Sequence, residues 1–210
     1  MILTPIEAQH LPAVLARFAA LLGEPARAVF HRIADPRKAQ RASGDEAAAH
    51  HRIALDLAAS FGMEILPGSP ALDFGWNGRA LRSATEAYVL LHEIAHFQIA
   101  PPQRRHRIDF ALGPGPETGD CAAAARDACL FGLEREAEEA MASLLGILWE
   151  VELGQPALAS FLDQNWLEGA GRPGAAAHFA KVLARLQQAG LADRAGRPQR
   201  RCSTAPRALA

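Results

Sequence analysis

Apolar residues recur every three or four positions over most of the chain, the spacing that gives an α-helix one apolar face. The pattern therefore predicts a largely helical protein. Two stretches, Thr4-Pro5-Ile6-Glu7 and Ser83-Ala84-Thr85-Glu86, place a hydroxyl residue three positions before a glutamate, which is typical of a capped helix start. The expected helices cover residues 4–22, 25–33, 43–60, 83–100, 121–154 with an interruption near Gly132, 157–166 and 175–189.

The helical pattern is lost between Met63 and Gly78. This stretch is rich in glycine and proline and holds only short apolar runs, which predicts irregular chain with one or two short strands. Further along, Pro101-Pro102 ends the preceding helix because proline lacks the amide hydrogen that the next turn needs. We expect a mostly α (α+β) fold with a small, irregular β element.

The 210 residues, 50% hydrophobic and 21% charged, are enough for one well-buried domain and too few for two of ordinary size. Residues 1–190 are expected to form that single domain. Residues 191–210 are basic, contain proline and have few large apolar side chains, so a mobile tail is expected there.

Charge and hydropathy narrow the class of protein. A formal net charge of -1 provides no broad basic field for nucleic acid or an anionic membrane. No run approaches the roughly 20 apolar residues that span a bilayer, and the N-terminal stretch does not resemble a signal peptide. Three cysteines without a CxxC pair suit a reducing compartment. We expect a cytoplasmic protein with neither membrane nor nucleic acid as its partner.

Candidate chemistry lies in the stretch LHEIAHFQIAPPQRRHRIDF. On a helix, His92 and His96 are about one turn apart, so both imidazoles project from one face and can bind a single metal ion. Glu93 lies next to His92, where it can accept a proton from a metal-bound water. This HExxH pattern is typical of metal-dependent enzymes. The alternative is an apolar helix with two unliganded histidines, which would leave buried polar groups unsatisfied at about 1–3 kcal/mol each.

A metal with two histidine ligands needs at least one more protein ligand, and a later glutamate-rich helix offers candidates. With Met141 at the centre of that helix's apolar face, an advance of about 100° per residue brings Glu134 onto the inward stripe. Glu138 falls at its edge. Glu134 is therefore the predicted third ligand, with Glu138 in reserve as a ligand or as the partner of a histidine ring. Glu136 and Glu139 are predicted to face solvent.

The stretch HEIAHFQIAPPQRRHRIDF is similar to the HExxHxxIAxxxRRxxxDF signature of the elongation factor P hydroxylase family. These enzymes have a zincin-like metal site and hydroxylate a modified lysine on that translation factor. The resemblance covers roughly residues 81–146. The matching positions are His92, Glu93, His96, Ile99, Ala100, Arg104, Arg105, Asp109 and Phe110.

The resemblance implies a zincin-like domain in which a glutamate of the Glu134–Glu138 segment completes the metal site, so that Glu136 also stays open at this point. Arg104, Arg105 and Asp109 would bind substrate or support the site. The chain departs from the family directly after the Asp-Phe pair, where ALGPGPETG stands in place of aromatic residues. A substrate other than elongation factor P is the alternative.

Three functions compete. The first is a non-haem iron hydroxylase in which His92, His96 and Glu134 hold Fe(II), with a protein substrate such as elongation factor P. The second is a Zn(II) hydrolase, a metallopeptidase with Glu93 as general base. The third is a non-enzymatic helical interaction module whose basic residues Arg194–Arg201 bind nucleic acid. The first is favoured, because of the extended signature and because a peptidase usually aligns its substrate on an edge strand.

Overall fold

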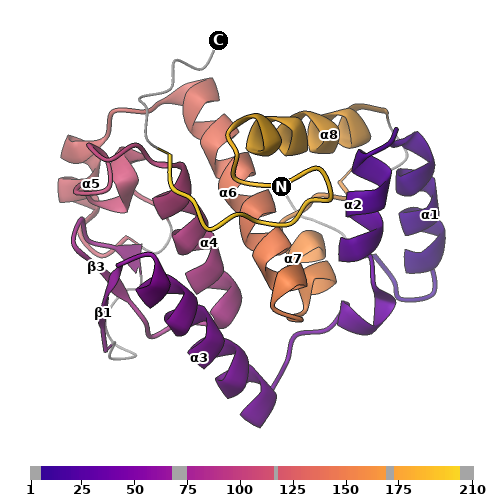
Figure 1. Cartoon of the computed structure of the whole chain (residues 1–210), viewed down its shortest axis with the longest axis horizontal. Helices are drawn as coiled ribbons and strands as arrows, with labels where there is room; N and C mark the ends of the chain where they lie inside the picture. The colour runs from indigo at the N-terminus through magenta and orange to yellow at the C-terminus, as the bar shows by residue number, and fades with distance from the viewer. Residues whose placement is uncertain (1–5, 68–74, 116–117, 169–172, 204–210) are drawn as a thin grey trace.

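The computed structural model describes residues 6–67, 75–115, 118–168 and 173–203 (Figure 1). The helices of this part are α1 (Leu11–Leu21), α2 (Ala26–Ile33), α3 (Gly44–Ser60), α4 (Ala87–Ile99), α5 (Cys121–Asp127), α6 (Gly132–Glu152), α7 (Ala157–Asp163) and α8 (Pro173–Gln188), with short 3-10 turns η1 (Pro36–Lys38) and η2 (Asp109–Ala111). The strands are β1 (Glu64–Leu66), β2 (Gly75–Trp76) and β3 (Ala80–Arg82). The predicted mostly α (α+β) fold is confirmed.

Helices α4 and α6 lie side by side at the centre of the molecule (Figure 1). Helix α3 packs against α4, whereas α7 and α8 pack against α6, and α1 and α2 close the far end. Large buried side chains fill the space between the outer helices and α6; four phenylalanine rings contact one another there, namely Phe18, Phe30, Phe161 and Phe179. This packing holds α6 on several sides, while the face of α6 that carries Gly146 meets α4.

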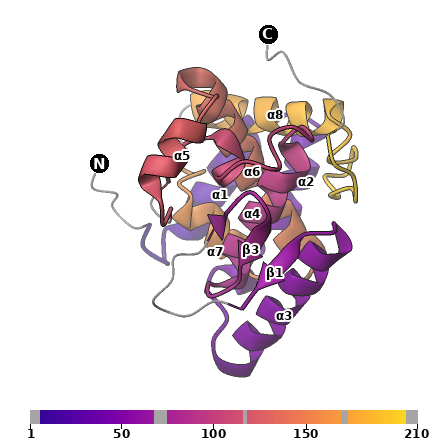
Figure 2. The same ribbon diagram turned by 90° about the vertical axis from the view of Figure 1, so that its left-hand side faces the viewer.

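The small sheet has the strand order β1-β3-β2, with β1 parallel and β2 antiparallel to β3. Figure 2 shows β1 and β3 beside α3, in front of α4. The strands are only two or three residues long, as the glycine- and proline-rich composition predicts. The sheet therefore covers one side of the central helix and adds Trp76 and Leu81 to the core.

Two predicted helix starts are wrong. The first helix begins at Leu11, where Pro12 occupies a position in the first turn that proline favours, while Thr4-Pro5 lies outside the described residues. The central helix begins at Ala87 because Ser83 is used elsewhere: its hydroxyl donates to the carbonyl oxygen of Leu66 in β1. The predicted interruption near Gly132 is confirmed, since α5 ends before it and α6 begins there.

Residues 191–203 do not form the detached tail that composition predicts. They cross α6 and α4 on one face of the molecule (Figure 1). The amide of Gln98 on α4 donates to the carbonyl oxygens of Gln199 and Arg201, at 2.8 Å each, and Leu191 is buried. Residues 204–210 lie outside the described part. Among the described helices, none combines the length and apolar character needed to cross a bilayer.

Candidate metal centre

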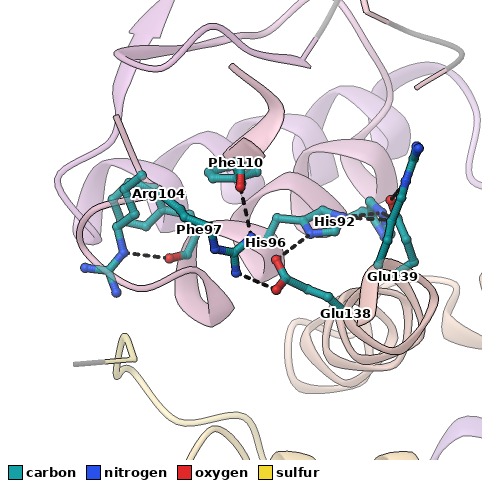
Figure 3. Close-up of polar contacts among 9 residues, drawn as sticks. His92, His96, Phe97, Arg104, Phe110, Glu138 and Glu139 are labelled. Carbon is teal, nitrogen blue, oxygen red and sulfur yellow. Dashed lines mark hydrogen bonds and ion pairs between the residues drawn. The ribbon is translucent and has the colours of Figure 1, made fainter. Parts of the chain in front are cut away.

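Two histidines of α4 and one glutamate of α6 converge on a single point (Figure 3). The Nε2 atoms of His92 and His96 lie 3.0 Å apart. Oε2 of Glu139 lies 3.6 Å from the first and 3.3 Å from the second. Metal–ligand bonds of about 2.0–2.2 Å place neighbouring ligand atoms of one ion roughly 3.0–3.5 Å apart. The three side chains therefore fit a single metal ion without rearrangement of the helices.

The close approach of α4 and α6 makes this convergence possible. A Cβ added to Gly146 of α6 would lie 3.3 Å from the backbone nitrogen of His92. Gly146 follows Glu139 by seven residues, about two helical turns, so both lie on the same face of α6. Ala142 lies between them on that face and is fully buried. Small residues thus bring the two backbones together and aim Glu139 at the histidines.

The structure brings Glu139, which was expected to face solvent, to the two histidines, whereas Glu134, the predicted third ligand, lies away from them. Glu134 is exposed and is not among the residues that line the adjoining pocket. Beyond Met141 nearly every residue of α6 is buried, whichever side it occupies, so the apolar stripe had no unique centre. The available signal was the small pair Ala142 and Gly146, which marks the face of close helix contact.

Glu138 lies behind His96 rather than beside the metal position. Its Oε1 is 3.9 Å from Nδ1 of His96, and both atoms are buried without a hydrogen-bond partner. Its other oxygen accepts a short hydrogen bond from Nη2 of Arg104. A metal-ligating histidine usually donates its second N–H to a carboxylate or a carbonyl group. Glu138 occupies the place of such a partner, which was the second of the two roles expected for it.

The site favours positive charge. Burial disfavours the imidazolium form of His96, but the carboxylates of Glu138 and Glu139 close to its ring outweigh this and raise the pKa of His96 to about 10. Burial also disfavours the Glu139 carboxylate, yet His92 and His96 hold the pKa of Glu139 far below its usual value. The charge of these two carboxylates can be balanced by protons on both imidazoles or by a divalent cation, which needs the imidazoles in their neutral form.

The three candidate ligands line a pocket of about 610 Å³. Glu93 and Asp109, both named from the sequence, also line it. Three further lining residues were not predicted from the sequence: Tyr88, Arg135 and Gln164. A second hollow of about 490 Å³ shares His92, Glu139 and Gln164 with the first. The candidate metal position can thus be approached from two sides.

Asp109 reaches the pocket from an unusual backbone turn. Asp109, Phe110 and Ala111 have φ angles of 44°, 54° and 63°, in the left-handed region, where each non-glycine residue costs about 1–2 kcal/mol. Asp109 accepts a hydrogen bond from the hydroxyl of Thr118. The ring of Phe110 stacks on Trp76 with centroids 5.5 Å apart. These contacts hold the strained turn in place beside the pocket.

The two arginines of the signature serve the structure around the pocket. Nη1 of Arg104 donates to the carbonyl oxygen of Phe110 at 2.9 Å. Arg105 donates to the carbonyl oxygens of Phe97 and Ser203 at 2.9 and 2.6 Å. Neither arginine lines the pocket. Arg104, Arg105 and Asp109 were expected to bind substrate or to support the site. Arg104 and Arg105 support the surrounding backbone, and of the three only Asp109 lines the pocket.

No family model, curated protein or solved structure matches this chain. The similarity to elongation factor P hydroxylases therefore rests on the nine matched positions of the short signature.

Proposed function

We propose that the protein is a metal-dependent hydroxylase of the non-haem iron type, with Fe(II) held by His92, His96 and Glu139. The convergence of these three side chains at the spacing of ligands to one ion carries the proposal. Two histidines and one carboxylate are the ligand set of many non-haem Fe(II) oxygenases, and they leave further coordination positions open. When bound, Fe(II) would supply the activation of dioxygen for hydroxylation.

The open side of the candidate centre supports this proposal. A hydroxylase must admit both an organic substrate and dioxygen. The larger pocket has room for a substrate side chain, and the hollow that shares His92, Glu139 and Gln164 offers a separate approach for a small molecule. Glu93 lines the larger pocket, where it can orient the substrate or exchange a proton with it.

The charge of the pocket favours a cationic substrate group. Among the described residues that line it, apart from the candidate ligands, are three carboxylates (Glu93, Asp109 and Glu136) against one cation, Arg135. A lysine-derived side chain on a protein such as elongation factor P fits that balance.

All three cysteines are free thiols, which suits the cytoplasm as the proposed location.

A Zn(II) hydrolase is the second candidate. It is favoured by the position of Glu93, which lines the pocket next to His92 and could act as the general base for a metal-bound water. Gly75 of the edge strand β2 also lines the pocket. Strand β2 is only two residues long, however, which gives a peptide substrate little backbone to pair with. We therefore rank hydrolysis below hydroxylation.

Metal content and oxygen consumption test the proposal. We expect protein purified anaerobically and reconstituted with Fe(II) to hold about one iron per chain and to consume dioxygen. Glu139→Gln should weaken metal binding at least tenfold. Glu134→Gln is the matched control, because it makes the same change on an exposed position of the same helix and should bind metal as the wild type does.

Other outcomes separate the alternatives. Stoichiometric zinc, no oxygen uptake and cleavage of a peptide library would replace hydroxylation by hydrolysis. Glu93→Gln should retain the metal in both cases and lose turnover. A wild-type protein that binds neither iron nor zinc, or binds them equally well after His96→Ala, would remove the metal centre itself from consideration.

A further inference from the structure

We infer that Arg104 and Glu138 are positioning residues that, together with the left-handed turn η2, hold the ring of His96 in the orientation a metal ligand needs. The inference rests on the proposed metal site and assigns these residues no direct contact with metal or substrate. It explains why the arginine and phenylalanine of the signature accompany the HExxH pattern.

The first observation is the pair of unsatisfied atoms behind the ring. Nδ1 of His96 and Oε1 of Glu138 face each other at 3.9 Å, and neither has another hydrogen-bond partner. A shift of less than about 1.2 Å would bring them to ordinary hydrogen-bond distance. That bond would satisfy both atoms, fix the tautomer of His96 and leave Nε2 free to bind metal.

The second observation is that Glu138 is itself held from the far side. Nη2 of Arg104 donates to Oε2 of Glu138, and Nη1 of Arg104 donates to the carbonyl oxygen of Phe110 (Figure 3). Both side chains of the ion pair are largely buried, at 12% and 5% exposure. The rigid fork of a guanidinium suits this double task, which a flexible lysine could not perform with the same geometry.

The third observation is that Phe110, whose carbonyl oxygen accepts from Arg104, also contacts the ring of His96. The ring of Phe110 lies against the ring of His96, with centroids 5.7 Å apart and planes 20° from parallel. Phe110 thus contributes its carbonyl group to Arg104 and its ring to His96. A right-handed or extended backbone at Phe110 would present these two groups in other directions, so the left-handed turn is what lets one residue make both contacts.

Arg105 differs from Arg104 in each of these respects. It donates to the backbone of Phe97 and Ser203, and its guanidinium lies over the ring of Phe97. None of these contacts reaches His96 or Glu138. Arg105 is therefore the matched control for Arg104: a neighbouring arginine with comparable hydrogen bonds and no place in the network.

Metal affinity measured without turnover tests the inference. We would titrate the metal-free proteins with Co(II) and with Zn(II) in competition with a chromophoric chelator, and record the visible spectrum of the Co(II) form. We expect Glu138→Gln, which keeps the side-chain volume, to weaken binding about 10- to 100-fold and to alter the Co(II) spectrum. Arg104→Lys should fall between it and the wild type, and Arg105→Met should bind metal as the wild type does.

A double variant, Arg104→Met with Glu138→Leu, removes both charges together, so that no single buried charge remains to unfold the chain. Its circular dichroism should match the wild type while its metal affinity falls. Wild-type affinity and spectrum in folded Glu138→Gln and in the double variant would overturn the positioning role. Absence of metal binding in the wild type would instead overturn the proposed function on which the role depends.

Discussion

Glu150 is buried at the end of α6, with 2% of its surface exposed and Nη1 of Arg41 at 3.4 Å from its Oε1. Burial raises the pKa of Glu150 to about 8, although Ser160 and Arg41 act to lower it. The folded chain therefore retains a proton that the unfolded chain releases above its ordinary pKa of 4.5. Between pH 4.5 and about 8, the folded state therefore binds more protons than the unfolded state. The contribution of Glu150 to the free energy of unfolding is thus greatest below pH 4.5 and falls as the pH rises towards about 8.

Replacing this one carboxyl group should remove that pH dependence. Glu150→Gln keeps the shape and the neutral charge, so its free energy of unfolding should vary less between about pH 6 and about pH 8 than that of the wild type. The difference in slope is at most about 1.4 kcal/mol per pH unit. Urea unfolding at several pH values measures it. Glu24→Gln, at an exposed position, is the control, and equal slopes in wild type and Glu150→Gln would contradict the prediction.

At the scale of elements, the metal centre depends on how closely α6 approaches α4. Gly146→Ala would place a methyl group 3.3–3.4 Å from backbone atoms of His92 and Leu91, so the helices must move apart. Overpacking of this kind costs about 1–3 kcal/mol, partly offset by about 1 kcal/mol of helix propensity. We expect a small loss of thermal stability and a clear loss of metal affinity, because Glu139 lies on the same face.

The control for this substitution is Gly174→Ala in α8, where an added Cβ meets no atom within 4 Å. It should leave metal affinity unchanged and the melting temperature equal or slightly higher. Metal titration and thermal unfolding of both variants are sufficient. Unchanged affinity in Gly146→Ala would mean that the spacing between α4 and α6 does not control the site.

The same two helices show what the sequence could and could not predict. Helix content and the His92–His96 pair follow from local periodicity, which depends only on residues a few positions apart. The side of α6 that meets α4 is marked in the sequence only by the small pair Ala142 and Gly146. The apolar residues beyond Met141 are buried on every side and give no unique face, so Glu134 was chosen over Glu139. The capping box at Ser83 was misleading for a similar reason, because the Ser83 hydroxyl bonds to a strand instead.

At the scale of the whole molecule, Gln98 joins three distant parts of the chain. Its side-chain oxygen accepts from Nε1 of Trp149 on α6, and its amide donates to two carbonyl groups of residues 191–203. Its own backbone carbonyl oxygen accepts from the backbone N–H of Ser203.

Composition predicted a mobile tail because residues 191–203 have few large apolar side chains. Backbone hydrogen bonds to one buried glutamine need no such residues, so composition could not reveal them.

Gln98→Ala should therefore loosen the segment and destabilise the fold. It leaves the Trp149 N–H and the carbonyl groups of Gln199 and Arg201 without this partner, for an expected loss of about 2–3 kcal/mol in the free energy of unfolding. The exposed Gln103→Ala is the control and should change it by less than about 0.5 kcal/mol.

Limited proteolysis with trypsin shows whether the segment itself is released, because Arg194, Arg200 and Arg201 are exposed cleavage positions within it. Because the Gln98 side chain donates to two carbonyl groups of the segment, we expect faster cutting there in Gln98→Ala than in the wild type, before the helices are attacked. Rapid cleavage at the same rate in both proteins would mean that residues 191–203 behave in solution as the mobile tail that composition predicts. Slow cleavage in the wild type alone would establish Gln98 as the residue that joins the segment to α4.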